Sequence, residues 1–309
     1  MRSGILLIGG LLGLVGGCQQ RASTGIQVAK STVAAAPLPP PPPTRYQASL
    51  PAPPVLPAPL PDQELTRFLQ QYAVVPVLQS VREGGETMPY NGFFGTDRHR
   101  IEVVFLQVQA DPAQPRLIHV SGKSRFKGKI KDLQGTIELT SIRLQPALNQ
   151  AEQAFEAEQE AMRMVTVVRL PGAEKPVAYY TLSGRFNWQE LPQTAGGTFT
   201  GSAELDVAVT DKHRLQSTSL RQTAGARGAD LLFDGSWTAN RSGQKKPFLL
   251  VENVAGFAEH VLKEFEVGER DVVINPKYAK LGWDTYWEND EWWIGSASTA
   301  RSLPAAARP

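Results

Sequence analysis

The sequence is poor in cysteine and histidine and has no apolar run long enough to cross a membrane. Cys18 is the only cysteine among 309 residues, so no intramolecular disulfide can form and a folded domain must rely on its hydrophobic core. The four histidines are isolated, without the H-x-x-x-H spacing of a helical zinc site. His99 and His119 could face each other across a hairpin, but we expect no metal site.

Catalytic motifs are also missing. The chain has no G-x-S-x-G nucleophile elbow, and Ser121-Gly122-Lys123-Ser124 does not complete a phosphate-binding loop because Leu117 stands where that motif needs a glycine. The formal net charge of +2 and the pI near 8.6 are too mild a bias to indicate a nucleic-acid partner. We therefore expect a protein that is not an enzyme and that binds neither a cofactor nor nucleic acid.

What the N-terminus does contain is an export signal. Arg2 precedes an apolar run from Ile5 to Val15, and Gly16 and Gly17 come directly before Cys18. A basic start, a short apolar core and small residues before a cleavage point are typical of secretory signal peptides. The run is shorter than the roughly 20 residues that span a bilayer. We assign residues 1–17 to this signal.

Leu14-Val15-Gly16-Gly17-Cys18 resembles the lipobox of bacterial lipoproteins. The resemblance implies that the Cys18 thiol receives a diacylglyceryl group, that the leader is removed and that the new amino terminus is acylated. Each buried acyl methylene contributes about 0.8 kcal/mol, so several chains would anchor the protein firmly in a membrane. By the same resemblance, Gln19 rather than aspartate after the cysteine implies transport to the outer membrane. The alternative is an ordinary signal peptide with an accidental cysteine.

A proline-rich linker follows the signal. About every second residue from Pro37 to Pro61 is proline, which favours an extended polyproline II path. At about 3.1 Å per residue this segment could extend roughly 75 Å. We assign residues 18–62 to the lipidated cysteine and linker, 63–295 to one domain and 296–309 to a disordered tail. The linker is either a plain spacer or a docking strand for a proline-recognising domain or an envelope layer.

Within the domain, apolar and polar residues alternate with period two. The clearest rows are Tyr180 to Trp188, Phe199 to Val209 and Leu231 to Trp237, with a weaker one from Ile118 to Phe126. Such rows predict antiparallel strands with one buried face. The segment from Ile101 to Val108 is apolar on both faces, which predicts a strand covered on both sides.

Glycines recur in the middle of the apolar faces, at Gly122, Gly184, Gly201 and Gly235. A glycine there weakens a strand, and the usual reasons for it are strong bending or the close approach of another backbone. The sequence therefore predicts a mainly β fold, a curved antiparallel sheet or barrel, and a two-sheet β-sandwich is the alternative. In pattern only, the domain is similar to lipocalin-like barrels, whose ligand-carrying role the resemblance would imply.

Two or three helices are expected around the sheet. Asp62 opens the first, in which Leu65, Phe68, Leu69 and Tyr72 share one face. The second runs from Asn149 to Met164 and the third from Val254 to Phe265.

A row of alternating cations is the first candidate binding feature. Lys123, Arg125, Lys127, Lys129 and Lys131 would lie on one face of a continuous strand. Such a row could hold the phosphates of lipid headgroups or lipopolysaccharide. The alternative is a solvated strand face whose lysines deter edge-to-edge aggregation.

An aromatic and acidic segment near the C-terminus is the second candidate binding feature. Its aromatic side chains could stack on the sugar rings of a glycan, and they are Trp283, Tyr286, Trp287, Trp292 and Trp293. If Glu288 and Glu291 or Asp290 stood about 5–9 Å apart in a cleft, glycoside hydrolysis would be conceivable. The alternative is that the aromatics close one end of the fold while the acids face water.

The sequence thus favours a membrane-anchored envelope lipoprotein with a non-catalytic domain that binds an envelope lipid or glycan. A structural or interaction protein of the envelope, with a filled β domain and a protein partner, is the alternative. A carrier should have a roomy interior, whereas an interaction protein should have a filled one.

The lipidation hypothesis is testable alone. Cys18→Ala should give an exported protein that is untethered or unprocessed, because the acyl acceptor is gone. Membrane fractionation and labelling with a radioactive fatty acid would measure this, with a Gln19→Ala variant as control. Native-like membrane association of Cys18→Ala would contradict the hypothesis.

Overall fold

The computed structural model describes part of the chain, which comprises residues 55–81, 85–155, 157–158, 174–218, 221–258, 261–262, 264–265, 275–288 and 290–294. The expected signal sequence, Cys18 and most of the linker lie outside these residues, and so does the expected tail 296–309. Of the helices described, none is both long and apolar enough to span a membrane.

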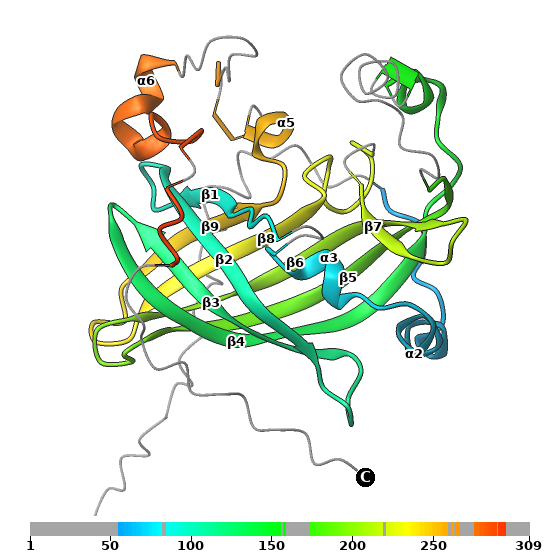
Figure 1. Ribbon diagram of the computed structural model, residues 1–309, viewed down its shortest axis with the longest axis horizontal. Coiled ribbons are helices and arrows are strands. Elements are labelled where there is room, and N and C mark those ends of the chain that lie inside the picture. The colour runs from blue at the N-terminus through cyan, green and yellow to red at the C-terminus, as the bar shows by residue number, and fades with distance from the viewer. Residues whose placement is uncertain are drawn as a thin grey trace, which may run out of the picture. The chain divides into compact units, whose positions relative to one another are not determined.

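Nine antiparallel strands form one sheet (Figure 1). They are β1 (Tyr90–Phe94), β2 (His99–Ala110), β3 (Leu117–Phe126), β4 (Lys129–Leu144), β5 (Pro176–Leu191), β6 (Gly197–Thr210), β7 (Leu215–Ser217), β8 (Leu231–Ala239) and β9 (Lys245–Val251). Each strand from β1 to β6 pairs with the next one along the chain. β8 then pairs with β6, and the short β7 is a side branch on β6.

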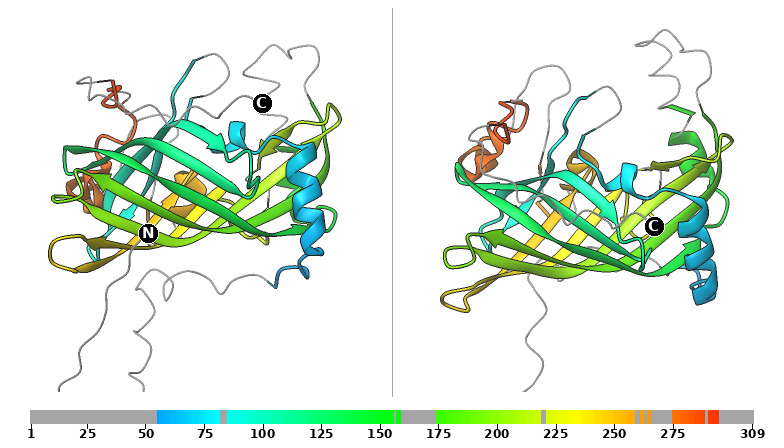
Figure 2. Two further views of the ribbon diagram at one scale, coloured as in Figure 1. Left: turned by 90° about the horizontal axis from the view of Figure 1, so that it is seen from below. Right: turned by 60° about the horizontal axis from the view of Figure 1, so that its bottom comes forward.

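The sheet closes on itself as a ring. β5 pairs with both β4 and β6, and β9 pairs with both β8 and β1, so hydrogen bonding continues around eight strands. The prediction of a curved, closed antiparallel sheet is confirmed, and the two-sheet sandwich does not form. In Figure 2, strands on the near side of the ring cross over strands on its far side, and α2 (Asp62–Gln71) lies at one end.

Aromatic rings fill the interior of the closed sheet. Phe186 stacks on Trp188 with ring centroids 4.3 Å apart, and Phe105 and Phe233 meet Trp188 edge-on at 5.1 and 4.9 Å. These side chains and Phe248 are at most 3% exposed. They come from four strands, β2, β5, β8 and β9, and together form one continuous core inside the ring.

The four strand glycines lie where neighbouring backbones approach. A Cβ on Gly201 would come within 2.1 Å of the Asp234 carbonyl oxygen, and one on Gly122 within 1.8 Å of the Val104 oxygen. Gly201 and Gly235 pair directly across β6 and β8. The two others pair beside bulges, Gly122 opposite Phe105 and Gly184 opposite Leu139. Close backbone approach, one of the two expected reasons, therefore accounts for these glycines.

Two helices cover one end of the ring. Leu65 and Phe68 of α2 join the inner core, and the Phe68 ring lies 4.9 Å from that of Tyr180. Arg116 donates to the Asp62 carboxylate at the start of α2. The following helix α3 (Val75–Leu78) buries Val77 and Leu78. The first expected helix is thus confirmed with the predicted start.

The third expected helix is shorter than predicted, and the second is only partly described. α5 covers only Val254–Ala258, and the described residues after it form turns instead of continuing to Phe265. Residues 150–155 are helical after an Asn149–Glu152 capping box, whereas 159–164 lie outside the described residues. A further short helix, α6 (Pro276–Tyr278), leads into the π-helical turn η1 (Ala279–Trp283).

A second hydrophobic core forms on the outer face of the sheet, where α5, α6 and η1 lie over β1 and β9 (Figure 1). Phe93 and Leu249 point outward from these strands and pack with Phe257, Phe265 and Trp283. On the neighbouring strand, Val104 packs outward against Trp292 and Trp293. β2 is therefore covered on both faces, as its sequence predicted.

The glycine contacts predict a large effect of substitution. Gly201→Val should lower the free energy of unfolding by about 2–4 kcal/mol, because its side chain would push β6 and β8 apart. Thr200→Val, on the exposed outer face of the same strand, is the matched control and should stay within about 0.5 kcal/mol. Denaturant unfolding would measure both, and equal stabilities would refute the close-approach explanation.

Candidate functional site

The predicted row of alternating cations is not a single strand face. Lys127 and Gly128 form a two-residue hairpin turn with positive φ at both positions (49° and 70°), so β3 ends at Phe126 and β4 begins at Lys129. Arg125 shares a face with Ile130, whereas Lys131 pairs with Ser124 on the other face. The prediction was wrong on this point, because the turn reverses the chain in the middle of the row.

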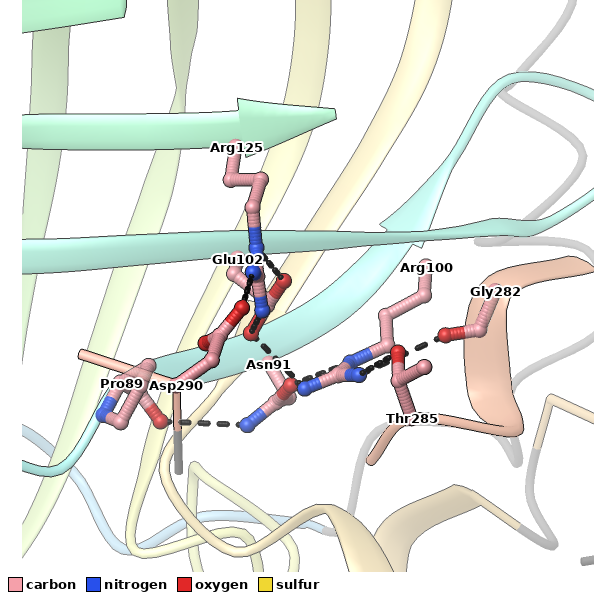
Figure 3. A network of polar contacts seen from close by, with 8 residues as sticks. All are labelled: Pro89, Asn91, Arg100, Glu102, Arg125, Gly282, Thr285 and Asp290. Carbon is pink, nitrogen blue, oxygen red and sulfur yellow. Dashed lines mark hydrogen bonds and ion pairs between the residues drawn. The ribbon is translucent and has the colours of Figure 1, made fainter. Parts of the chain in front are cut away.

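Arg125 belongs to a buried network on the outer face of the sheet (Figure 3). Glu102 on β2 accepts hydrogen bonds from Arg125 at 2.5 and 2.8 Å and from Arg100 at 2.8 Å. Arg100 also donates to the Asn91 side-chain oxygen at 2.8 Å. The side chains of Arg100 and Glu102 are 4% and 7% exposed. Two guanidinium groups thus share one carboxylate with little access to water.

The C-terminal segment 282–293 closes this network. Arg100 donates to the Thr285 hydroxyl at 3.2 Å, and Arg125 pairs with the Asp290 carboxylate. Arg100 lies 5.4 Å from the centre of the Tyr286 ring, and Arg125 lies 5.0 Å from that of Trp292. The arginines therefore bind the aromatic segment to the strands by hydrogen bonds and cation–π contacts together.

The site shifts the pKa values of the two arginines in opposite directions. Burial lowers the pKa of Arg100, and the attraction of Glu102 opposes that effect. Burial would also lower the pKa of Arg125, but hydrogen bonds to Glu102 and Asp290 raise it overall. The carboxylates of Glu102 and Asp290 thus compensate the burial of Arg125, whereas the burial of Arg100 is only partly offset.

Most of the aromatic candidates for glycan contact are covered. Trp283 is fully buried in the outer core, and Trp292 and Trp293 are 6% and 7% exposed. Tyr286 is half-buried against Arg100, and Trp287 is 47% exposed. Sugar stacking stays a prediction for the exposed Trp287 face, whereas the others serve to pack the segment onto the sheet.

The carboxylates and histidines considered for chemistry do not converge. Glu288, Asp290 and Glu291 are exposed, and Asp290 is paired with Arg125, so nothing in their surroundings favours a glycosidase pair. His99 pairs with Phe94, whereas His119 pairs with Gln109 near the far end of β2, so the two do not face each other. Among the described residues, no cluster of three or more histidine or acidic side chains could hold a metal ion.

A basic surface forms instead at one end of the ring, which we call the lysine-rimmed end. The strand registers bring four connections to this end, namely 95–98, 127–128, 192–196 and 240–244. Cationic side chains outnumber carboxylates there. The cationic residues are Arg98, Lys127, Lys129, Lys131, Arg241, Lys245 and Lys246. The carboxylates are Asp97, Asp132 and Glu190.

Aromatic rings form the floor of the lysine-rimmed end. The Phe94 ring lies 4.6 Å from that of Phe126 and 5.4 Å from that of Trp237. Lys127 places its ammonium group 5.5 Å from the Phe126 centroid, and Lys246 lies 5.5 Å from Phe94. The chain therefore holds two ammonium groups from different hairpins over one aromatic cluster.

Comparison with known proteins finds no matching family model, no matching curated protein and no matching solved structure.

Glu190 is a buried hydrogen-bond acceptor beneath the aromatic floor. Its carboxylate is 5% exposed and accepts hydrogen bonds from Lys131 at 2.8 Å, the Trp237 indole at 3.2 Å, the Ser124 hydroxyl at 3.2 Å and the Gly197 amide at 3.0 Å. The Lys131 ammonium group is thus already paired with the Glu190 carboxylate. The side chains of Lys127, Lys129 and Lys245 are exposed, and Lys246 is half-buried. Anions can approach these lysines from solvent.

Sequence reasoning found only part of this surface. Lys127, Lys129 and Lys131 were candidates, but Lys245 and Lys246 were not, because they lie on another hairpin and reach the site only through ring closure. The glycine after Lys127, between two alternating rows, is a hairpin signal that could have corrected the interpretation.

The buried network gives a stability prediction. Glu102→Gln should lower the free energy of unfolding by about 3–5 kcal/mol, because it leaves two buried guanidinium groups without a full counter-charge. Glu138→Gln is the matched control, since Glu138 pairs with Arg185 on an exposed surface and should cost less than about 1 kcal/mol. Denaturant unfolding followed by tryptophan fluorescence would measure both. A loss for Glu102→Gln no greater than for the control would contradict the assigned role.

Proposed function

We propose that the chain is a non-catalytic envelope lipoprotein, anchored through lipid on Cys18, whose β domain docks onto anionic membrane lipid through its lysine-rimmed end. The observation that carries the proposal is the convergence of Lys127, Lys129, Lys245 and Lys246 on one end of the sheet. Each lysine near an anionic membrane surface contributes about 1 kcal/mol, so a few of them suffice for docking.

The filled interior supports an external site over an internal one. Phe105, Phe186, Trp188, Phe233 and Phe248 occupy the centre of the ring and are nearly inaccessible to solvent. A lipid carrier of this architecture needs a roomy interior lined by apolar side chains. The ligand-carrying role that the lipocalin-like pattern implied is therefore not the function we propose.

The chemistry of the lysine-rimmed end favours phosphate over neutral sugar. Lys127 lies over the Phe126 ring, and Lys246 lies over the rings of Phe94 and Trp237. These ammonium groups occupy positions that a stacked sugar ring would need. Held in place by the rings, they lose less freedom when they bind an anion than lysines on a flexible loop would lose.

The filled interior equally suits an interaction protein with a protein partner, which is the second candidate. An acidic protein surface would satisfy the same lysines. Vesicle binding separates the two candidates, because lipid docking needs no second protein.

Vesicle co-sedimentation of residues 18–309 carrying Cys18→Ser tests the proposal without the acyl anchor. Binding should be strong for vesicles that contain anionic phosphatidylglycerol, weak for pure phosphatidylcholine, and reduced by salt. Lys127→Gln/Lys246→Gln should weaken binding roughly thirtyfold, since two lysines are removed.

The matched control is Lys175→Gln/Lys212→Gln, two exposed lysines at the connections of the opposite end of the ring. This variant loses the same charge but should bind as the parent does. Equal losses in the two variants, or equal binding to both kinds of vesicle, would rule out docking by the lysine-rimmed end and favour a protein partner.

A further inference from the structure

Two acidic residues lie on the outer face of β6, toward the end of the ring opposite the lysine-rimmed end. Asp206 is 1% exposed, and its neighbour on the same strand face, Glu204, is half-buried. The segment 221–230 covers them, and its residues Ala224, Ala226 and Ala229 are fully buried. The segment has no helix or strand of its own, so its position depends on what it touches.

Asp206 is the group that the segment touches most directly. Its carboxylate accepts hydrogen bonds from the Ala226 amide at 2.8 Å and from the Thr181 hydroxyl of β5 at 2.5 Å. Its backbone amide donates to the Asp230 carbonyl at 2.9 Å, and its carbonyl accepts from the Thr218 amide at 3.0 Å. One residue of β6 thus contacts both ends and the middle of the region 218–230.

Ionisation of this residue is costly. Burial raises the pKa of the Asp206 carboxyl to about 7, hydrogen bonds from Thr181 and Ala226 partly oppose this, and the nearby Glu204 raises it further. Burial also raises the pKa of Glu204, against a hydrogen bond from Ser183 and the charges of Arg143 and Arg227.

The remaining charged groups of the covering elements engage other partners. Arg221 donates to the Pro146 carbonyl and lies 4.8 Å from the centre of the Tyr179 ring. Asp234 on β8 acts on Arg227. Glu204 acts directly on the Asp206 carboxyl and opposes its ionisation, while Arg227 acts on Glu204.

We propose that Asp206 is a proton-operated latch that holds segment 221–230 against β5 and β6. With the carboxyl protonated, the segment closes over a neutral group. With the carboxyl ionised, a charge stands beside Glu204 in a buried site, and opening of the segment relieves it by admitting water.

The direction of the pH dependence follows from proton linkage. Opening exposes the carboxyl, whose pKa then returns toward 3.8, from about 7 when closed. Between these values opening releases a proton, so the open fraction rises with pH and levels off above about pH 7. The closed state is favoured in mild acid.

Opening would affect the outer core as well as the segment. Ala226 and Ala229 pack in the same cluster as Phe93, Leu249 and Val254, which supports α5 on the sheet. The latch therefore couples proton concentration to the face of the molecule on which the C-terminal elements lie. This inference does not depend on vesicle binding by the lysine-rimmed end.

Hydrogen–deuterium exchange on the full-length protein in detergent micelles tests the latch. After correction for intrinsic exchange rates, amides of 221–230 should open about ten- to a hundredfold more at about pH 7 than at about pH 5. Amides in β2 should show a much smaller change, since they are covered on both faces.

Asp206→Asn should abolish this pH dependence, because the amide keeps the shape but carries no titrating proton. Glu204→Gln provides a second variant and should move the plateau to lower pH by removing the neighbouring charge. A flat profile in the parent protein, or the parent's profile retained in both variants, would overturn the proposal.

Discussion

The pairing of β9 with β1 closes the ring, and the rest of the structure depends on it. Closure removes the two sheet edges that would otherwise present unpaired backbone groups. It also requires strands to approach closely and bend, which glycines such as Gly201 and Gly235 permit. Without side chains at these points, neighbouring backbones meet and the aromatic rings beside them fill the enclosed space.

Closure also creates an outer surface that has to be covered. β1 and β2 carry apolar and charged residues outward, among them Phe93, Val104, Arg100 and Glu102. A bare surface of this kind would leave apolar area in water, and the buried arginines need partners. The described residues between Val254 and Ile294 supply both the apolar cover and further partners for the arginines. The aromatic residues near the C-terminus are thereby drawn into packing.

Much of the fold could be predicted from local pattern. The alternation along Phe199 to Val209 specifies a strand with one buried face, and the glycines within such rows indicate a closely packed, curved sheet. The site was harder to predict. Lys127-Gly128 was interpreted as the middle of a strand because the alternation continues in phase through the turn, so the cations seemed to share one face. The third helix was expected to be longer because helical spacing alone does not mark where α5 ends.

The sequence by itself determined β2, β3, β5, β6, β8 and the first helix, because each depends on neighbours two to four residues away. It also contains the N-terminal segment that we expect to act as an export and lipidation signal. Only the tertiary structure decided which residues meet across the ring. Lys127 and Lys246 share an aromatic floor, Glu102 lies between two arginines, and Asp206 meets Ala226, since strand pairing brings together residues that are distant along the chain.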